Sequence, residues 1–190
     1  MIIGVTGKSG SGKTTITDLI NKNNEYEIIH VDDITHTILD FNEVKEELRL
    51  IYGNKIFSND NSVDRKKLGN ILFNDTNEMN KYNKFIYSFI EKYIDNIISS
   101  TSKNIIIDWM QLPLSKYFNL SSFNILVDAP LELRKERVGK RDNVSESYFE
   151  SRERNSLNYD NYNFDFVFIN DDNNIGEKIK YLNKKIERES

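Results

Sequence analysis

Cysteine is absent from the 190-residue sequence, and only two prolines and two histidines occur in it. A chain without cysteine has no disulfide scaffold, no thiolate metal ligand and no thiol nucleophile. The two histidines, His30 and His36, are too few for a histidine-rich metal site. Because prolines are scarce and no low-complexity linker interrupts the chain, no domain boundary is obvious. We therefore expect a single domain over residues 1–190.

Basic residues are not in excess, since 26 Lys and Arg face 30 Asp and Glu and leave a net charge of −4. We therefore expect neither nucleic acid nor an anionic membrane as a partner. The apolar start of the chain, residues 1–5, is too short to cross a membrane. It also lacks the basic region that opens a signal peptide, so the cytoplasm is the expected location. An aromatic content of 12% argues against disorder.

Short runs rich in Ile, Val, Phe and Tyr alternate with longer amphipathic segments along the chain. The short runs predict β-strands over residues 1–6, 26–31, 104–108, 123–127 and 164–169. The other segments predict helices that begin at Lys13 and at Asp32 or Asp33, and helices over 42–52, 64–73, 77–100, 131–140, 145–155 and 175–188. This alternation indicates an α/β fold, with a five-stranded parallel sheet covered by helices on both faces. The helical stretch after the second strand is too long for one crossover, so we place a substrate-binding insertion at residues 40–103.

A glycine-rich segment between the first strand and the first helix has the complete pattern G-x-x-x-x-G-K-[ST]. Its glycines let the backbone wrap an anion with its N–H groups, and the helix that follows adds its positive N-terminal end. Lys13 supplies a charge to the β- and γ-phosphates, and the Thr14 hydroxyl is a ligand for Mg²⁺. The alternative, a turn that is merely rich in glycine, fits this context poorly. We expect the phosphates of a nucleoside triphosphate, most simply ATP, to bind at Gly7, Lys8, Ser9, Gly10, Ser11, Gly12, Lys13, Thr14 and Thr15.

Acidic residues stand at the carboxyl ends of two predicted strands, which is the edge where open α/β sheets bind ligands. Asp32 and Asp33 follow the second strand, and Asp108 ends the third. A carboxylate at Asp32 can accept the proton of a sugar hydroxyl and help to hold Mg²⁺. The alternative is that one of the two adjacent acids only caps the helix that begins there. Asp108 is a further candidate for binding Mg²⁺ or the acceptor.

The segment 131–157, after the fourth strand, is dense in basic residues and predicts a lid. Arg137 and Arg141 are spaced i, i+4 and therefore share one helical face, where they can clamp a phosphoryl group as charge develops on it. We expect the neighbouring Arg134 and Lys135 to belong to a solvated face instead.

Four motifs together resemble the dephospho-CoA kinase family, whose members are P-loop kinases of the nucleoside-monophosphate-kinase type. These four motifs add to the phosphate loop, and together the resemblance covers about residues 1–175. The matching residues are His30-Val31-Asp32 with His36, Asp64-Arg65 with Leu68 and Phe73-Asn74-Asp75, the arginines Arg137, Arg141 and Arg152, and the closing run Phe164 to Asn170.

The resemblance implies a three-layer P-loop NTP hydrolase fold and transfer of phosphate from ATP to the ribose 3′-hydroxyl of dephospho-CoA. Asp32 would be the base and, with Thr14, a ligand of Mg²⁺. Lys13, Arg137 and Arg141 would neutralise the γ-phosphate, and Asn170 would lie near the adenine. The acceptor would be bound by Asp32, His36, Arg65 and Asp108. The protein is expected to act as a monomer.

The sequence departs from the family pattern mainly where the acceptor is expected to bind. His30 replaces an acid, Tyr87-Ser88 stand in place of His-Pro, Met110-Gln111-Leu112 stand in place of Pro-Leu-Leu, and Ser156 replaces Gln. His36 and Arg65 also have ordinary roles open to them, as a turn cap and as part of a solvated helix face. Two other functions therefore remain open: a nucleoside, nucleotide or sugar kinase on the same fold, and a nucleotide-binding protein without turnover.

Overall fold

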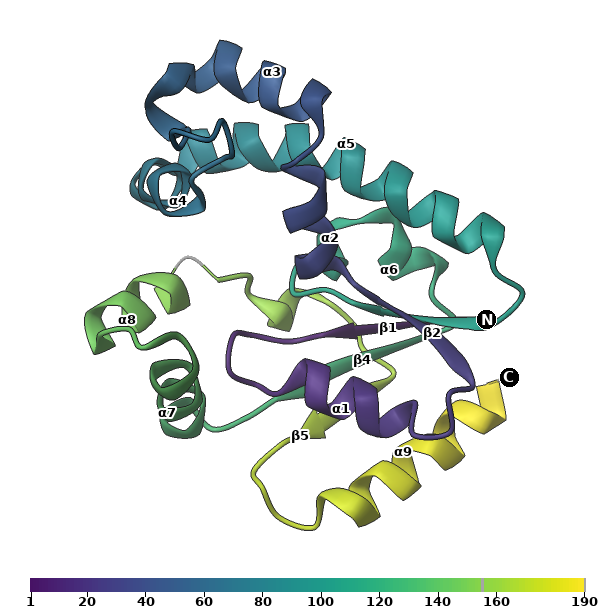
Figure 1. The fold of residues 1–190 in the computed structure, drawn as a ribbon. Helices are drawn as coiled ribbons and strands as arrows, with labels where there is room; N and C mark the ends of the chain where they lie inside the picture. Colours follow the sequence, from purple (N-terminus) through teal and green to yellow (C-terminus); the bar gives the residue numbers. More distant parts are fainter. Residues whose placement is uncertain (155, 190) are drawn as a thin grey trace. The chain divides into compact units, whose positions relative to one another are not determined.

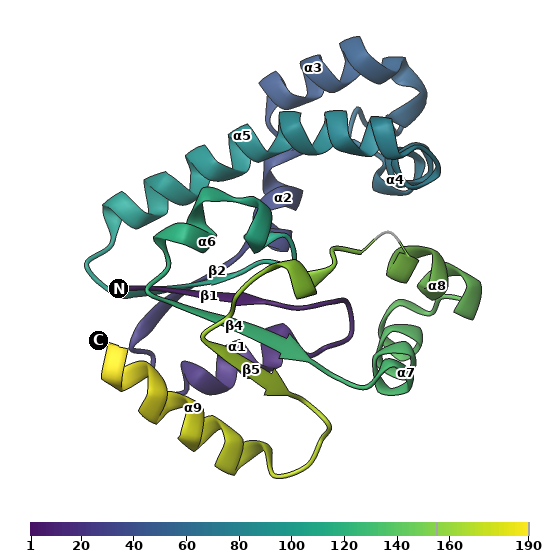
Figure 2. The same ribbon diagram turned by 180° about the vertical axis from the view of Figure 1, so that it is seen from behind.

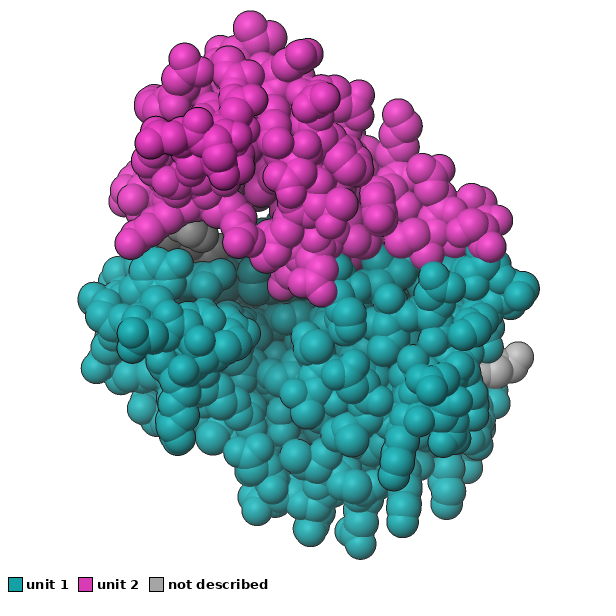
Figure 3. Space-filling view, in the orientation of Figure 1, with its two compact units in different colours: residues 1–30, 101–190 teal, residues 31–100 magenta. Residues whose placement is uncertain are grey.

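The computed structural model describes residues 1–154 and 156–189; the side chain of Phe73 is not described either. Asn155, the last residue of the helix expected over 145–155, lies outside the described residues. The chain divides into two compact units (Figure 3), one made of Met1–His30 and Thr101–Ser190 and the other of Val31–Ser100. Each unit is described by itself.

The first unit is built on a five-stranded sheet in which every pair of neighbouring strands is parallel. Its strand order is β2-β3-β1-β4-β5, which confirms the α/β fold and the five parallel strands. The strands are β1 (Ile2–Thr6), β2 (Tyr26–His30), β3 (Asn104–Asp108), β4 (Phe123–Asp128) and β5 (Phe166–Ile169). The strand β1 lies at the centre of the sheet, and the loop that follows it therefore opens at the middle of the carboxyl edge.

Two helices cover one face of this sheet, α1 (Lys13–Ile20) and α9 (Ile175–Glu189), as Figure 1 shows. Apolar residues of the strands alternate along the chain and meet Ile16 of α1 and Leu182 of α9 in one buried cluster. The short helix α6 (Lys116–Leu120), which follows a 3₁₀ turn at Leu112–Leu114, lies on the opposite face (Figure 2). The sheet with helices on both faces forms the three layers expected of this fold.

Two further helices follow β4 in the first unit, α7 (Leu131–Asp142) and α8 (Glu146–Arg154). They correspond to the basic segment expected to form a lid. A short 3₁₀ turn at Tyr159–Asn161 then leads back to β5. The strand β5 begins at Phe166 rather than at Phe164, because Asp165 pairs with Asn124 of β4 through its backbone N–H and its carboxylate before the strand starts.

The second unit consists of helices: α2 (Val31–Ile38), α3 (Asn42–Tyr52), α4 (Arg65–Asn74) and α5 (Thr76–Ser100), with a 3₁₀ turn at Gly53–Ile56. Ile86, Ile90 and Ile94 recur at i, i+4 along α5 and are buried. The unit includes α2 and thus starts before the insertion expected from residue 40. Within the described residues of the chain, no helix is both long enough and apolar enough to span a membrane.

Candidate nucleotide-binding site

The phosphate loop, here residues 7–14, joins β1 to α1 at the middle of the sheet edge. Gly12 precedes α1 in a left-handed conformation with φ of 87°, and a Cβ there would lie 2.3 Å from Asn170 Nδ2. Gly10, with φ of 79°, is equally close to α7, since its Cβ would lie 2.5 Å from the Arg134 carbonyl oxygen. Both positions therefore require glycine for backbone conformation and for space. The loop is packed between α7 and the segment that follows β5.

Asn170, at the end of β5, holds the loop in place. Its side chain is 4% exposed, and its Nδ2 donates a hydrogen bond to the Ser11 carbonyl oxygen at 2.8 Å. Its backbone N–H donates to the Asp128 carbonyl oxygen at 2.7 Å. The asparagine expected near the adenine is thus a fixed neighbour of the phosphate loop in this structure.

Arg137 of α7 also contacts the loop backbone. Its guanidinium donates to the carbonyl oxygens of Gly10 and Ser11 at 3.2 and 3.4 Å, and to Asp172 Oδ1 at 2.6 Å. A further hydrogen bond of 3.3 Å reaches the Asn170 carbonyl oxygen. Arg137 therefore joins the phosphate loop to the segment after β5 through neutral carbonyl groups and one exposed carboxylate.

Arg141 and Arg152, the two other arginines of the expected lid motif, meet at Asp142. The Arg141 guanidinium binds both carboxylate oxygens of Asp142 at 2.6 and 2.8 Å, and Arg152 lies 3.8 Å from Oδ2. The hydrogen bond from Arg141 is the main reason why the pKa of Asp142 is lowered, and the charge of Arg152 adds to it. The structure thus brings Arg141 and Arg152 together around an anion, whereas Arg137 is engaged separately at the loop.

Three polar side chains gather at the carboxyl ends of β2 and β3. The Thr14 hydroxyl donates to Asp108 Oδ2 at 2.9 Å, and His30 Nδ1 lies 3.2 Å from the same oxygen. Asp108 is only 5% exposed, and its other oxygen, Oδ1, is buried without a hydrogen-bond partner among the described residues. A buried carboxylate oxygen without a donor is costly unless a ligand satisfies it. Thr14 and Asp108 therefore place two oxygen donors side by side, and their role as ligands of a cation stays a prediction.

One basic side chain was assigned wrongly from the sequence: Arg134 is not on a solvated face. It is 5% exposed and binds Glu153 of α8 with two nitrogens, at 2.7 and 2.9 Å. Its Nε donates to the Ala129 carbonyl oxygen at 3.2 Å. Lys8 of the phosphate loop donates to the same carboxylate at 2.7 Å. We call Lys8, Arg134 and Glu153 the Glu153 cluster.

The Glu153 cluster is ionised over a wide pH range. Hydrogen bonds from Arg134 first, and then from Lys8, lower the pKa of Glu153 to about 2. Because this pKa lies below the ordinary value for glutamate, the ionised cluster stabilises the fold above about pH 4.5 and loses that effect only as the pH falls toward 2. The cluster therefore persists at any pH used for an activity assay.

The remaining predicted site residues lie in the second unit and are described within it. Asp32 and His36 are exposed and one turn apart on α2, so they share a helical face. Asp32 occupies the first turn, where a carboxylate is stabilised by the helix dipole. Arg65 is the exposed first residue of α4, and Asp64 caps that helix by accepting hydrogen bonds from the backbone N–H groups of Lys66 and Lys67. Their roles toward a substrate stay predictions.

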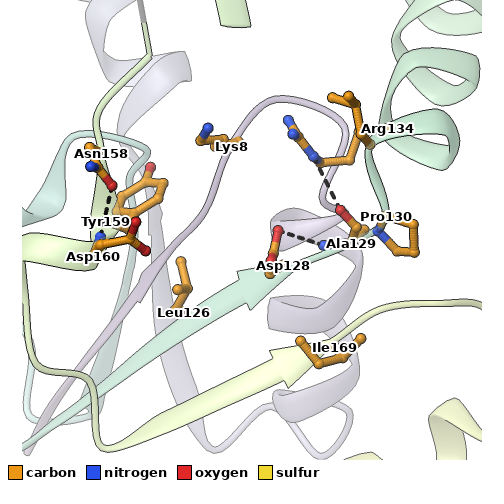
Figure 4. Close-up of a pocket in the computed structure, with 11 residues that line it drawn as sticks. Lys8, Leu126, Asp128, Ala129, Pro130, Arg134, Asn158, Tyr159, Asp160 and Ile169 are labelled. Carbon is orange, nitrogen blue, oxygen red and sulfur yellow. Dashed lines mark hydrogen bonds between the residues drawn. The ribbon is translucent and has the colours of Figure 1, made fainter.

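A cavity of about 510 Å³ opens beside the phosphate loop, in the size range of small-molecule sites. Figure 4 shows Tyr159 and Arg134 on opposite sides of the lining, Lys8 between them on the loop, and the strand residues Leu126 and Ile169 below. No motif in the sequence indicated this cavity, because its walls come from four separate segments. The lining residues are Lys8, Leu126, Asp128, Ala129, Pro130, Leu131, Arg134, Asn158, Tyr159, Asp160 and Ile169.

Known proteins similar to this chain point to one family. A family model described as dephospho-CoA kinase matches residues 1–175. The dephospho-CoA kinase of Borreliella burgdorferi is 33% identical over 139 residues, which is 73% of this chain and 67% of that protein. The dephospho-CoA kinase of Fusobacterium nucleatum is 27% identical over 192 residues, covering 99% of this chain and 96% of its own.

Solved structures agree on the fold. A Thermus thermophilus protein superposes with a TM-score of 0.82 at 22% identity, covering 100% of this chain and 97% of its own. A dephospho-CoA kinase from Campylobacter jejuni gives a TM-score of 0.65 at 23% identity, with 98% and 97% covered. Since the family match covers residues 1–175, including the phosphate loop, the Thr14–Asp108 pair and the arginines of α7 and α8, the chain belongs to the dephospho-CoA kinase family.

Proposed function

We propose that this protein transfers the γ-phosphate of ATP to the ribose 3′-hydroxyl of dephospho-CoA, giving coenzyme A and ADP. The observation that carries the proposal is the pairing of Thr14 with the buried Asp108 beside a complete phosphate loop. This arrangement lies within residues 1–175, which match the dephospho-CoA kinase family. The relatives named above carry the same activity in their names.

The donor half of the reaction belongs to the first unit. Backbone N–H groups of the phosphate loop and the N-terminus of α1 bind the phosphates of ATP, and the Lys13 ammonium offsets charge on the γ-phosphate. Arg141 and Arg152 already surround the Asp142 carboxylate, so an anionic phosphoryl group can replace this carboxylate when the nucleotide binds. Asn170 and Arg137 keep the loop in the conformation that binds phosphate.

The side chains of Thr14 and Asp108 suit Mg²⁺ as a bound ion. The Thr14 hydroxyl and Asp108, with its unsatisfied Oδ1, offer the hard oxygen ligands that this ion prefers. Among the described residues, no group of three or more acidic or histidine side chains is placed to hold a metal. Mg²⁺ usually relies on few protein ligands and on the substrate's phosphates, which agrees with this arrangement. When bound, the ion would neutralise charge on the phosphate oxygens of ATP.

The acceptor half rests on Asp32, which we propose as the base that takes the proton of the 3′-hydroxyl and as a second contributor to Mg²⁺ binding. His36 lies on the same helical face and, with Arg65 and Asp108, is proposed to contact dephospho-CoA. Exclusion of water during the transfer prevents hydrolysis of ATP. We also propose that the protein acts as a monomer in the cytoplasm, where ATP is available.

The acceptor is tested by measuring ADP release with ATP and a panel of hydroxyl compounds. We expect turnover with dephospho-CoA and background rates with deoxyadenosine, shikimate and a simple sugar. The product should carry the new phosphate at the 3′ position, as ³¹P NMR can show. Turnover only with a nucleoside or sugar would move the assignment to another kinase on this fold, and nucleotide binding without turnover on any acceptor would indicate a binding protein.

Replacing Asp108 with asparagine tests the metal site. Asp108→Asn keeps the shape and one oxygen but removes the charge, so the Mg²⁺ concentration for half-maximal activity should rise by about tenfold or more. The measurement is a Mg²⁺ titration at saturating ATP. Asp128→Asn is the matched control, because Asp128 also ends a strand of the sheet, β4, but is exposed and lies beyond β1 from Asp108. An unchanged Mg²⁺ requirement in Asp108→Asn would remove Asp108 from the proposed site.

A further inference from the structure

The Glu153 cluster connects three elements that the proposed reaction needs in fixed positions. Lys8 belongs to the phosphate loop, Arg134 to α7 and Glu153 to α8. One carboxylate accepts three hydrogen bonds from these two cations, at 2.7, 2.7 and 2.9 Å. Charge-assisted hydrogen bonds of this kind fix geometry more strongly than neutral ones.

The phosphate loop has a second contact with the same part of α7. Gly10 packs so closely against Arg134 that a Cβ would lie 2.5 Å from the Arg134 carbonyl oxygen and 3.0 Å from its Cα. The Arg134 side chain is also fixed by its Nε, which donates a hydrogen bond to the Ala129 carbonyl oxygen. The loop therefore rests on the α7 backbone at Arg134, and the buried side chain of the same residue binds Glu153.

Lys8 and Lys13 have different environments although both belong to the loop. The Lys8 ammonium is bound to Glu153, with their side chains 28% and 23% exposed. Lys8 and Arg134 both line the cavity, and Figure 4 shows the Lys8 side chain projecting from the loop toward the side of Tyr159. A lysine held in this way neutralises a carboxylate and contributes less direct charge to a bound nucleotide.

We propose that Glu153 is a positioning residue: by binding Lys8 and Arg134 together, it holds the phosphate loop against α7 and α8 in the arrangement that accepts the nucleotide. It acts through the loop and does not touch the phosphates. This inference rests on the proposed function only in that the loop binds a nucleotide. ADP affinity measured by calorimetry needs no acceptor, so failure of this inference is distinguishable from an error in the acceptor.

Two substitutions separate positioning from direct binding. Lys8→Met removes the ion pair between Lys8 and Glu153, and Glu153→Gln removes its negative charge. If the variants occupy the nucleotide-accepting arrangement about one-fifth of the time, the apparent Kd for ADP and the KM for ATP rise about fivefold, with kcat within about twofold. Both variants break the same Lys8–Glu153 ion pair, so the double variant should bind ADP about as weakly as the weaker of the two single variants.

The direction in which Glu153→Gln changes the affinity for ADP decides between two explanations. If Glu153 only withdrew Lys8 from the phosphates, its removal would free a cation and delete a nearby negative charge, so ADP would bind more tightly. Tighter binding of ADP by Glu153→Gln therefore overturns the proposal. So does a loss of ADP affinity in the double variant that equals the product of the two single losses. Lys8→Arg, which keeps the ion pair, should restore the wild-type KM to within about twofold.

Stability is measured in parallel, because Glu153→Gln weakens a buried partner of Arg134. Lys8→Met leaves the Arg134–Glu153 pair intact, so it keeps the test valid if Glu153→Gln fails to fold. Lys8→Met with wild-type affinity for ADP and wild-type KM for ATP would show that the cluster is structural only.

Discussion

Lys13→Ala is expected to lower kcat/KM for ATP by about 10³-fold or more, which amounts to loss of measurable turnover in a standard assay. Lys13 is the first residue of α1 and follows Gly12, whose left-handed backbone turns the loop into the helix. Within the described residues, no hydrogen bond or ion pair occupies its ammonium, in contrast to Lys8. It is therefore the loop cation that is available to meet charge on the transferring phosphate.

The measurement for Lys13→Ala is a steady-state assay of ADP release at several ATP concentrations, accompanied by thermal unfolding. Lys22→Ala is a suitable control, since Lys22 is exposed just beyond the end of α1 and loses a charge of the same type. We expect wild-type rates in this control. A Lys13→Ala protein that is folded and retains wild-type kcat/KM would overturn the assignment of the phosphate loop.

The strands were predictable because each is a short apolar run. β1 and β3 are buried along almost their whole length, whereas β5 at the edge of the sheet exposes Val167 and Ile169. β3 has the bounds expected from sequence, Asn104–Asp108, and the other strands differ by one or two residues at an end. By contrast, α6 was missed, since a helix of five residues is too short to show a helical period even though Tyr117 within it is fully buried. Local pattern therefore predicts elements that are long or continuously apolar.

The phosphate loop was also predictable from local sequence, because all its parts are contiguous. The Glu153 cluster was not, since Arg134 and Glu153 stand on two different helices and Lys8 on a distant loop. One signal was available: Arg134 is spaced i, i+4 from Val138, and both are buried on the same face of α7. An arginine on the apolar face of a helix needs a buried partner, and this requirement pointed away from solvent.

The arginines of α7 and α8 show how much residue spacing alone can predict. Arg137 and Arg141 are i and i+4, which suggested one clamp. In the structure Arg137 binds loop carbonyls, whereas Arg141 binds Asp142 together with Arg152. The side chains of arginine are long enough that neighbours on one helical face can serve different partners. The spacing predicted a shared face, but it did not predict which anion or carbonyl each guanidinium would bind.

Asp32→Asn is expected to lower kcat by about 10²-fold or more while the affinity for ADP stays at the wild-type value. Asp32 follows the last residue of β2 by two positions and is exposed in the first turn of α2. Asparagine has nearly the same shape, but its amide cannot take the proton of the acceptor hydroxyl. The loss should therefore fall on the transfer step and not on nucleotide binding, which belongs to the other unit.

Asp33→Asn provides the matched control for Asp32→Asn, because Asp33 is the adjacent acid in the same turn and is also exposed. Both variants lose one negative charge near the start of α2, so a general electrostatic effect would appear in both. Only Asp32→Asn should lose kcat, measured as ADP release with saturating dephospho-CoA and Mg²⁺. If Asp32→Asn keeps most of its kcat, or if Asp33→Asn loses as much, Asp32 is not the base and the acceptor proton leaves by another route.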